Sequence, residues 1–396
     1  DPDYNVRAST SELWTGRMIW DKLDGEFGPI NVPGTSPVWP INGYMIEGFP
    51  MVLDPSAYPE KMKDYIPDDY IKPDDRNTRE GRRRGYFENF EKRKKAFDRI
   101  DEDVDTRIEV YQLTDASAHR SASIDDVLEA YEAVDEIIGK RMEEYDDILI
   151  VSDHGFTHVD KFFYINTWLK EKGFLSEKDD QAKKSFEGRV QQLLWPLAET
   201  ALRPIMKYAN DLLRNNTSID FSPKGDAMDE IEFTETEAFS FRGGANIFAD
   251  IVINDSRFDE GCVEDREKKA EEIKQELEKE DFIKRVEKRE DVYDEPEKMP
   301  DLIVETDGDT GIGVAMFSKP LFDTDAFIHR REGIIAARGP SFSENGIKDA
   351  NLIDVAPTIS HYMGQEIDCD GKVLDIFDES FEPEKPENNE ISGIDI

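Results

Sequence analysis

The feature that most constrains the fold is a helical stretch between two strand-like runs. Residues 125–145 carry an apolar stripe at helical spacing, made by Val127, Leu128, Tyr131, Val134, Ile137 and Ile138. The run 108–113 before it alternates apolar and polar residues, and the apolar run 148–151 follows it. A strand, a crossover helix and a second strand predict a βαβ unit with parallel strands, and therefore an α/β protein.

Metal-ligand residue types follow both predicted strands. Asp115 and His119 come after the first strand, and one helical turn places positions four apart on the same face, so these two side chains can hold a single ion. Asp153 and His154 come after the second strand, and Gly155 lets the backbone turn there. Because the carboxyl ends of parallel strands meet at one edge of a sheet, we expect both pairs at that edge.

His329 is the fifth candidate ligand, since it precedes a short apolar strand and a turn that ends at Gly339. With Asp115, His119, Asp153 and His154 it makes a set of nitrogen and oxygen ligands without a thiolate, which suits Zn²⁺ best and Mn²⁺ as an alternative. The set holds more ligands than one catalytic zinc ion uses. It therefore predicts two divalent metal ions, an arrangement that serves phosphoryl transfer.

Other polar residues have weaker patterns. His158 lies four residues after His154 and can reach a metal or a substrate, whereas His361 lies inside a predicted helix and is expected to be structural. Thr35 and Ser36 lie in a loop rich in Pro and Gly, so we expect turn-forming hydroxyls there and not nucleophiles.

The composition is strongly acidic along the whole length. The chain has 90 Asp and Glu against 50 Lys and Arg, a formal net charge of -40, which predicts a halophilic protein from a high-salt environment. Such a surface excludes nucleic-acid binding through a general basic field, and 38% apolar residues argue against disorder. The cluster Arg82 to Arg84, on a predicted solvated helix, can steer an anionic substrate.

Cysteines and apolar runs exclude other classes. Cys262 and Cys369 have no partner spacing, so neither a disulfide framework nor a thiolate metal site is predicted, and we expect them to be buried or incidental. No run is long enough to span a membrane, and no signal segment opens the chain, which predicts a cytoplasmic protein without a membrane partner. The helical stretch 189–214 is expected to be a lid on the main domain, with a membrane-surface helix as the alternative.

Four motifs together resemble the alkaline phosphatase superfamily, specifically its type I phosphodiesterase/nucleotide pyrophosphatase-like branch. In the family's order they are Asp115-x-x-x-His119, Ser152-Asp153-His154-Gly155-Phe156, His329-Arg330-Arg331-Glu332-Gly333 and Asp354-Val355-Ala356-Pro357-Thr358. Segments 31–33, 42–46, 48–49 and 300–302 are similar to the family as well, so the similarity covers most of residues 4–378. It implies an α/β fold with a central, mostly parallel sheet flanked by helices.

The domain organisation expected from this resemblance has three parts. Residues 1–176 and 300–378 form the α/β core, and residues 177–299 form an insertion with a helical lid and strands. The insertion is expected to contain an acidic helix at 264–280, and a core strand is expected at 301–305. The acidic tail 379–396 is expected to be disordered.

The resemblance also implies roles for the candidate ligands. Asp115, His119 and His329 would hold one ion, and Asp153 and His154 the second. The family needs a further Asp at the end of its first strand and a Thr or Ser nucleophile, and neither has a match here. We therefore expect that this sequence lacks its N-terminal part and that the nucleophile lies upstream of Asp1.

The implied function is a metal-dependent hydrolase of phosphate esters, of phosphodiesterase, phosphatase or nucleotide pyrophosphatase type, with a small anionic phosphate ester or nucleotide as substrate. A Thr or Ser would attack phosphorus to form a covalent phospho-enzyme, which water then hydrolyses. The alternatives are a phosphoglycerate-mutase-like or sulfatase-like enzyme of the same superfamily, or a non-catalytic metal-binding pseudoenzyme. The motifs do not separate these functions, because the pocket outside the ligands decides the substrate.

Overall fold

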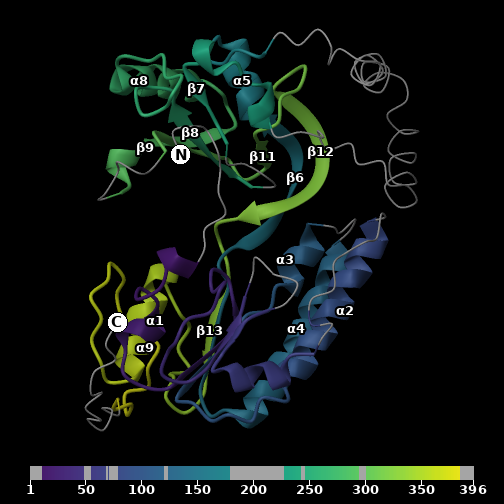
Figure 1. Ribbon diagram of the computed structural model, residues 1–396, viewed down its shortest axis with the longest axis vertical. Coiled ribbons are helices and arrows are strands. Elements are labelled where there is room, and N and C mark those ends of the chain that lie inside the picture. The colour runs from purple at the N-terminus through teal and green to yellow at the C-terminus, as the bar shows by residue number, and fades with distance from the viewer. Residues whose placement is uncertain are drawn as a thin grey trace. The chain divides into compact units, whose positions relative to one another are not determined.

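The structure is a computed structural model that describes residues 11–48, 55–67, 70, 79–119, 124–178, 227–241, 246–293 and 300–383. These residues form two compact units. One, here called the flanking unit, holds the described residues within 8–76, 81–153 and 333–396, and the other, the central unit, holds those within 77–80 and 154–332. Both names refer to position in the sequence. Each unit combines sheets with helices, which confirms the predicted α/β class (Figure 1).

The flanking unit contains a four-stranded, mostly parallel sheet with the order β3-β2-β1-β4. Strand β1 (Phe27–Val32) is parallel to β2 (Met45–Glu47) and to β4 (Thr106–Glu109), and β3 (Ala57–Tyr58) is antiparallel to β2. The central strand β1 is buried over most of its length, as expected for a parallel strand covered on both faces. Ile30 of this strand packs with Tyr44 and Ile46 in one apolar cluster.

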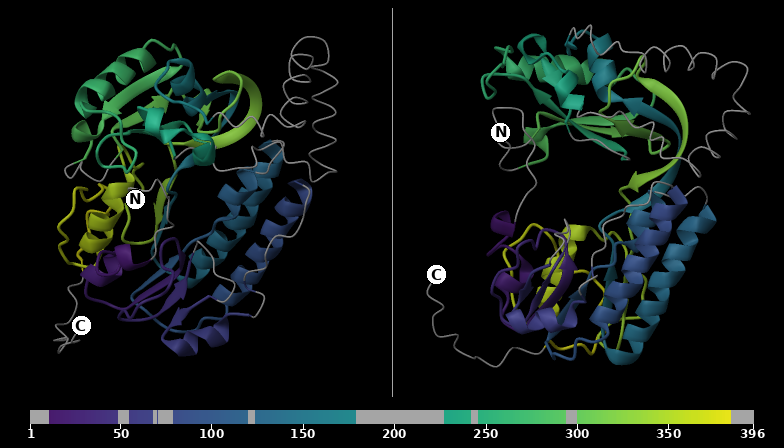
Figure 2. Two further views of the ribbon diagram at one scale, coloured as in Figure 1. Left: turned by 45° about the horizontal axis from the view of Figure 1, so that its top comes forward. Right: turned by 45° about the vertical axis from the view of Figure 1, so that its right-hand side comes forward.

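Two long helices of the flanking unit, α2 (Arg79–Phe97) and α4 (Ile124–Glu144), run side by side (Figure 1 and Figure 2). Helix α4 confirms the amphipathic helix predicted at 125–145 and buries Val127 and Ile137. Leu128, which belonged to the predicted apolar stripe, is instead 50% exposed. Arg83, from the arginine cluster on α2, pairs with Glu129 of α4 at 2.8 Å.

The flanking unit also contains several short helical elements. They are η1 (Ser11–Leu13), α1 (Ile19–Lys22), η2 (Glu60–Tyr65), α3 (Leu113–Ala118), η7 (Leu352–Asp354) and α9 (Val355–Tyr362). Helix α3 follows β4 directly and carries the first candidate ligands, so its position decides where they lie.

The strands before and after α4 do not pair with each other in the described part of the chain. β4 pairs with β1, whereas β5 (Ile148–Val151) pairs antiparallel with β13 (Ile335–Arg338) in a separate two-stranded sheet. The prediction of a βαβ unit with these two strands parallel in one sheet was therefore wrong. The reason is that hydrogen-bond partners far apart in the sequence leave no local pattern.

The predicted strand 108–113 was also wrong at its carboxyl end, because β4 ends at Glu109 and α3 begins at Leu113. Glu109 is held by two arginines, Arg107 at 2.6 Å and Arg141 of α4 at 2.9 Å. Leu113 packs into a cluster with Ala130 and Ile137 of α4. These contacts favour a turn into a helix over a longer strand, although the residues alternate in polarity.

The central unit contains two sheets. The first has the order β7-β8-β10-β9 and is antiparallel, with β7 (Ala238–Phe239), β8 (Phe248–Ile253), β10 (Leu302–Thr306) and β9 (Ile283–Lys288). The second has the order β11-β6-β12, in which β6 (Gly155–Tyr164) is antiparallel to β12 (Leu321–Arg330) and parallel to β11 (Thr310–Gly313). β10 confirms the strand predicted at 301–305.

The helices of the central unit are α5 (Ile165–Glu171), α8 (Arg266–Leu277) and the short elements η3 (Ala227–Glu230), η4 (Phe233–Glu235) and η5 (Arg289–Asp291). α8 confirms the acidic helix predicted at 264–280. Trp168 of α5 and Ile273 of α8 are buried in one apolar cluster with β8 and β10. The stretch 189–214, with its expected lid, and most of the tail 379–396 lie outside the described residues. None of the helices in the described ranges is long and apolar enough to cross a membrane.

Candidate functional site

Asp115 and His119 lie at the two ends of one helical turn in the flanking unit. Asp115 belongs to α3, and His119 is the residue that follows this helix. The backbone N–H of His119 donates to the carbonyl oxygen of Asp115 at 3.2 Å, which closes the turn. Nε2 of His119 lies 3.3 Å from Oδ1 of Asp115, as the spacing predicted, and both side chains are partly exposed. One carboxylate oxygen and one imidazole nitrogen thus lie side by side.

Asp153 follows β5 in the same unit and is exposed. The residue before it, Ser152, is held from both sides by the chain that leads into β13. The N–H of Ser152 donates to the carbonyl oxygen of Ile334 at 2.9 Å, and the N–H of Ile334 donates to Oγ of Ser152 at 2.7 Å. These two bonds fix the backbone from which the carboxylate of Asp153 extends.

His154 and His329 meet in the central unit. Their rings stack with centroids 3.9 Å apart and an interplanar angle of 27°, and the ring of Phe156 packs edge-on against His329 at 5.1 Å. The pairing of β6 with β12 creates this contact, because it places His329 opposite Phe156 and Arg330 opposite Gly155. Two imidazoles therefore offer nitrogen ligands at one place.

The sequence predicted that Gly155 allows the backbone to turn, but the structure requires a glycine here because the neighbouring backbone is too close for a side chain. A β-carbon at this position would lie 2.1 Å from the carbonyl oxygen of Glu332, so any residue with a side chain would push the two segments apart. Nδ1 of His154 lies 3.2 Å from the carbonyl oxygen of Gly155, within reach of a hydrogen bond that would orient the ring.

Two arginines follow His329. Nε of Arg330 donates to Glu332 at 2.7 Å, and the guanidinium of Arg331 lies over the ring of Phe248 at 5.2 Å and 3.8 Å from the buried Glu305. The side chain of Arg331 is 56% exposed. Each of these guanidinium groups therefore pairs with a carboxylate of the central unit.

The remaining polar candidates have structural contacts. His158 is exposed, with Nε2 2.8 Å from Oδ1 of Asp325 on the neighbouring strand. His361 packs against the ring of Phe377 at 5.0 Å, in keeping with the structural role predicted for it. Thr35 is fully buried and its Oγ1 donates to the carbonyl oxygen of Val32 at 2.8 Å, which confirms a turn-forming hydroxyl.

Both cysteines are exposed thiols, so the expectation of a buried role was wrong, and the alternative of incidental residues remains. The Sγ of Cys262 donates to the carbonyl oxygen of Thr236 at 3.1 Å. In line with the absence of a partner spacing in the sequence, both are free cysteines.

Comparison with known families places these residues in context. The family model described as type I phosphodiesterase / nucleotide pyrophosphatase matches residues 1–313, which is most of the chain. The chain belongs to this family. The resemblance of the motifs is thereby confirmed, and the mixed α/β architecture agrees with the alkaline-phosphatase-like fold expected for a type I phosphodiesterase/nucleotide pyrophosphatase family member. Asp115, His119, Asp153 and His154 lie within the matched residues, and His329 lies beyond them.

Among solved structures, the chain is similar to phosphonoacetate hydrolase from Sinorhizobium meliloti 1021 in complex with phosphonoformate, with 11% sequence identity and a TM-score of 0.28. The similarity covers 58% of this chain and 45% of the phosphonoacetate hydrolase chain. The present chain therefore spans less than half of the length of that hydrolase. A comparison with curated proteins gave no match.

Proposed function

We propose that this protein is a metal-dependent hydrolase of phosphate esters, of phosphodiesterase, phosphatase or nucleotide pyrophosphatase type. The observation that carries the proposal is the family match over residues 1–313. The side chains near the ends of α3, β5 and β12 support this proposal. They offer oxygen and nitrogen ligands of the kind that divalent transition metals bind.

The proposed ligand arrangement follows the family's order. Asp115, His119 and His329 each offer one ligand atom, a carboxylate oxygen and two imidazole nitrogens, and are proposed to hold one ion. Asp153 and His154 are proposed to hold the second. The donor set fits such ions, because Asp115 and His119 already lie 3.3 Å apart and the set has no thiolate that would favour a softer metal. Zn²⁺ is the proposed metal, with Mn²⁺ as the alternative.

The chain's own residues hold this set in place. Two metal ions, when bound, would polarise a phosphoryl oxygen and stabilise negative charge that develops on the attacking and leaving oxygens. Ser152 fixes the backbone before Asp153, and the contact with Phe156 limits the rotation of the His329 ring. Arg331, two residues after His329 in the sequence and half-exposed, is proposed to supply a cation for an anionic substrate. The nucleophile is not among these residues and is proposed to be a Thr or Ser outside them.

The proposed substrate is a small phosphate ester or a nucleotide. A chain with a formal charge of -40 repels anions in general, so productive binding needs local positive charge. Bound divalent ions and Arg331 can supply that charge at the candidate site. A small anionic substrate can bind within such a local field of positive charge. A long polyanion would also contact the surrounding acidic surface, which would repel it.

Metal binding is the first test. We expect the natural protein to bind two Zn²⁺ ions, as measured by elemental analysis and isothermal titration calorimetry. His329→Ala should weaken binding of one ion by about tenfold or more, because it removes a direct ligand. His158→Ala, which removes an exposed imidazole from the same pair of strands, and His361→Ala should bind as the natural protein does. Circular dichroism checks that each variant is folded.

The reaction is tested with three chromogenic esters: p-nitrophenyl phosphate, bis-p-nitrophenyl phosphate and p-nitrophenyl sulfate. Zn²⁺-dependent release of p-nitrophenol from a phosphate ester, lost in His329→Ala, is the expected result. Release from the sulfate alone would contradict the phosphate substrate class. Tight metal binding without turnover of any ester would contradict the hydrolase and favour a pseudoenzyme.

A further inference from the structure

One residue of the central parallel strand β1 has an unusual backbone. Asn31 has a φ of 61°, in the left-handed region that residues other than glycine seldom occupy. The pairing of β1 with β2 shifts its register between Ile30 and Val32, so that Asn31 is accommodated as an extra residue, as in a β-bulge. Such a bulge bends the strand and changes the direction of the side chain it carries. A local departure from regular strand geometry therefore places Asn31 near the carboxyl end of β1.

The side chain of Asn31 is buried, and one half of its amide has a partner. Asn31 is 1% exposed, and its Nδ2 donates to the carbonyl oxygen of Val110 at 2.8 Å. Its Oδ1 accepts no hydrogen bond from the residues that the structure describes. A left-handed backbone and a buried oxygen without a donor both cost free energy, and a glycine would avoid both costs. The bond to Val110 is what this side chain contributes and a glycine could not.

The bond to Val110 continues the pairing of β1 with β4 beyond the last backbone pair. Ile30 is paired with Glu109, and the N–H of Val110 donates to the carbonyl oxygen of Ile30 at 3.2 Å. The next donor along a regular parallel ladder would be the backbone N–H of residue 32. The side-chain amide of Asn31 donates in its place. Val110 is thus held to β1 through both its N–H and its carbonyl oxygen, although β4 ends at Glu109.

This hold on Val110 fixes the approach of the chain to α3. Val110 lies three residues before Leu113, the first residue of α3, which is buried and packs in one cluster with residues of α4. The side chains of Asp115 and His119 are 44% and 27% exposed, so their positions depend mainly on the backbone of α3. Val110 and Leu113 together therefore determine where this pair of candidate ligands lies in the flanking unit.

We propose that Asn31 is a positioning residue for Asp115 and His119, because its bond to Val110 places α3 so that both side chains can hold one ion. This inference rests on the proposed metal-dependent function. Asn31 is not a ligand itself, since its side chain is buried and its Nδ2 is bonded to the backbone. It acts through the segment between β4 and α3. Replacing residues that orient metal ligands commonly lowers metal affinity about tenfold or more.

The test measures Zn²⁺ binding by isothermal titration calorimetry in three variants. Asn31→Gly removes the amide and allows the left-handed backbone without strain. Asn31→Asp keeps the size of the side chain but replaces the donor with an oxygen, which repels the carbonyl oxygen of Val110. Asp349→Gly is the matched control, because Asp349 also has a positive φ, of 51°, and is exposed in the same unit. Urea unfolding establishes that each variant is folded during the titration.

We expect Asn31→Gly to weaken about tenfold the binding of the ion that is lost in Asp115→Ala, and to leave the affinity for the other ion unchanged. Asn31→Asp should weaken the same binding event, although its added negative charge by itself would attract a cation. In a chain that already carries Asp115→Ala, Asn31→Gly should have no further effect, because the ligand pair through which it acts is incomplete. Asp349→Gly should bind both ions as the natural protein does.

Two results would overturn the positioning role and leave the proposed hydrolase intact. One is Zn²⁺ binding by both Asn31 variants that equals that of the natural protein. The other is equal weakening of both ions, which would indicate a general disturbance of the fold. If Asn31→Gly does not fold, Asn31→Asp decides between these results. A natural protein that binds no Zn²⁺ would instead overturn this inference and the proposed function together.

Discussion

At the scale of single residues, Tyr44 shows how burial controls an ionisable group. Its ring packs on the backbone of Gly28, where a β-carbon would lie 2.4 Å from the ring, and the side chain is 2% exposed. Its hydroxyl makes no hydrogen bond in the described part of the chain. Burial raises the pKa of Tyr44 from 10.0 to about 12, although Arg107 opposes the shift.

This pKa predicts an alkaline loss of stability that Tyr44→Phe should reduce. The folded chain holds the phenol proton more tightly than the unfolded chain does. The contribution of this proton to the free energy of unfolding is therefore complete below pH 10 and is lost as the pH rises through about 12. At pH 7 the variant should change the free energy of unfolding by no more than ~1 kcal/mol, because the lost hydroxyl had no partner. Urea unfolding at pH 7 and pH 11 measures both effects. A variant that loses stability above pH 10 as steeply as the natural protein would contradict the assignment.

At the scale of elements, α8 illustrates a helix whose start is defined by one side chain. Asp265 is the N-cap, and its carboxylate accepts a hydrogen bond from the N–H of Lys268 at 3.0 Å. Such a cap satisfies a backbone donor that has no partner within the helix. On its inner face the helix buries Ala270, Ile273 and Leu277, so a loosened first turn would disturb the packing of the central unit.

Asp265→Ala should lower the free energy of unfolding of the central unit by about 1 kcal/mol, the usual effect of losing an N-cap. Amide hydrogen exchange in the first turn of α8 should become faster, and urea unfolding followed by fluorescence of the buried Trp168 should shift to lower urea. Glu264→Ala is the matched control, since Glu264 is the exposed residue just before the cap. Equal effects of the two substitutions would argue against a specific cap.

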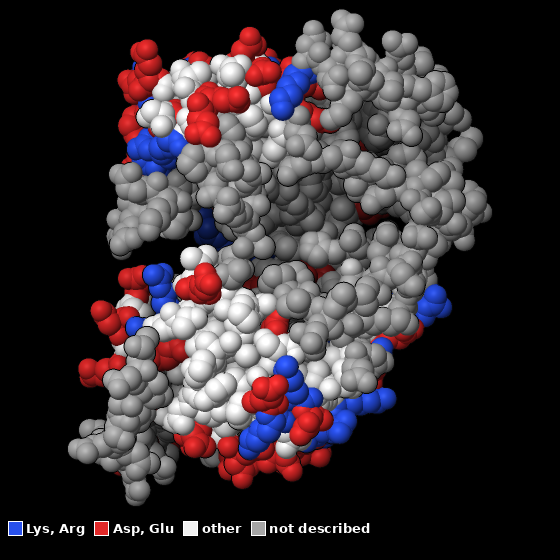
Figure 3. Space-filling model, viewed as in Figure 1, with Lys and Arg blue, Asp and Glu red and all other residues white. Residues whose placement is uncertain are grey.

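At the scale of the whole molecule, the acidic excess is the dominant feature. Acidic side chains are spread over the visible faces of both units, with lysines and arginines between them (Figure 3). Many of the basic residues are paired within their own unit, as Lys61 is with Glu102 and Lys288 with Glu271. Exposed pairs of this kind add little stability each, so the net charge of -40 still repels itself.

We predict that stability and activity rise with salt, as expected for a halophilic protein. The screening length falls from roughly 10 Å at 0.1 M to 3 Å at 1 M, so the unfolding temperature should rise over this range of KCl. At pH 5, close to the sequence pI of about 4.4, the net charge is small and the same salt series should have a weaker effect. Inactivation in molar KCl, or an equal salt effect at both pH values, would refute salt adaptation through charge.

Local patterns predicted individual elements well. The stripe at 125–145 corresponds to α4, and the acidic segment at 264–280 corresponds to α8. The apolar run 148–151 is β5 to the residue. These features depend on side-chain periodicity, which is a property of neighbouring residues. The spacing of Asp115 and His119 likewise predicted a contact, because a single helical turn is short and has one geometry.

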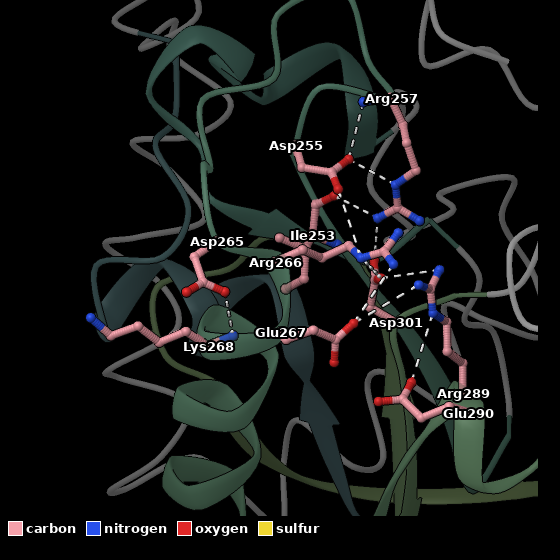
Figure 4. Close-up of polar contacts among 10 residues, drawn as sticks. All are labelled: Ile253, Asp255, Arg257, Asp265, Arg266, Glu267, Lys268, Arg289, Glu290 and Asp301. Atoms are coloured by element: carbon pink, nitrogen blue, oxygen red, sulfur yellow. Dashed lines mark hydrogen bonds and ion pairs between the residues drawn. The ribbon is translucent and has the colours of Figure 1, made fainter.

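Pairing between distant segments was not predictable in the same way. Nothing local in Ile148–Val151 indicates an antiparallel partner at Ile335–Arg338, and the prediction that this strand shares a parallel sheet with the strand before α4 was wrong. The stack of His154 on His329 likewise arises from the register of β6 and β12, which a shift of one residue would abolish. The arginines around Asp301 come from the turn after β8, from α8 and from η5, and no spacing in the sequence connects these segments (Figure 4).

The sequence by itself therefore determined the α/β class, the amphipathic helices, the acidic character and the residue types of the candidate metal ligands. The family match covers the motifs of Asp115, His119, Asp153 and His154, whereas that of His329 lies beyond it. Only the tertiary structure decided which strands are partners, why Gly155 has no side chain, and where three guanidinium groups gather. The physical reason is range: periodicity and capping act within a few residues, whereas strand pairing and charge clustering depend on segments that meet only after the chain has folded.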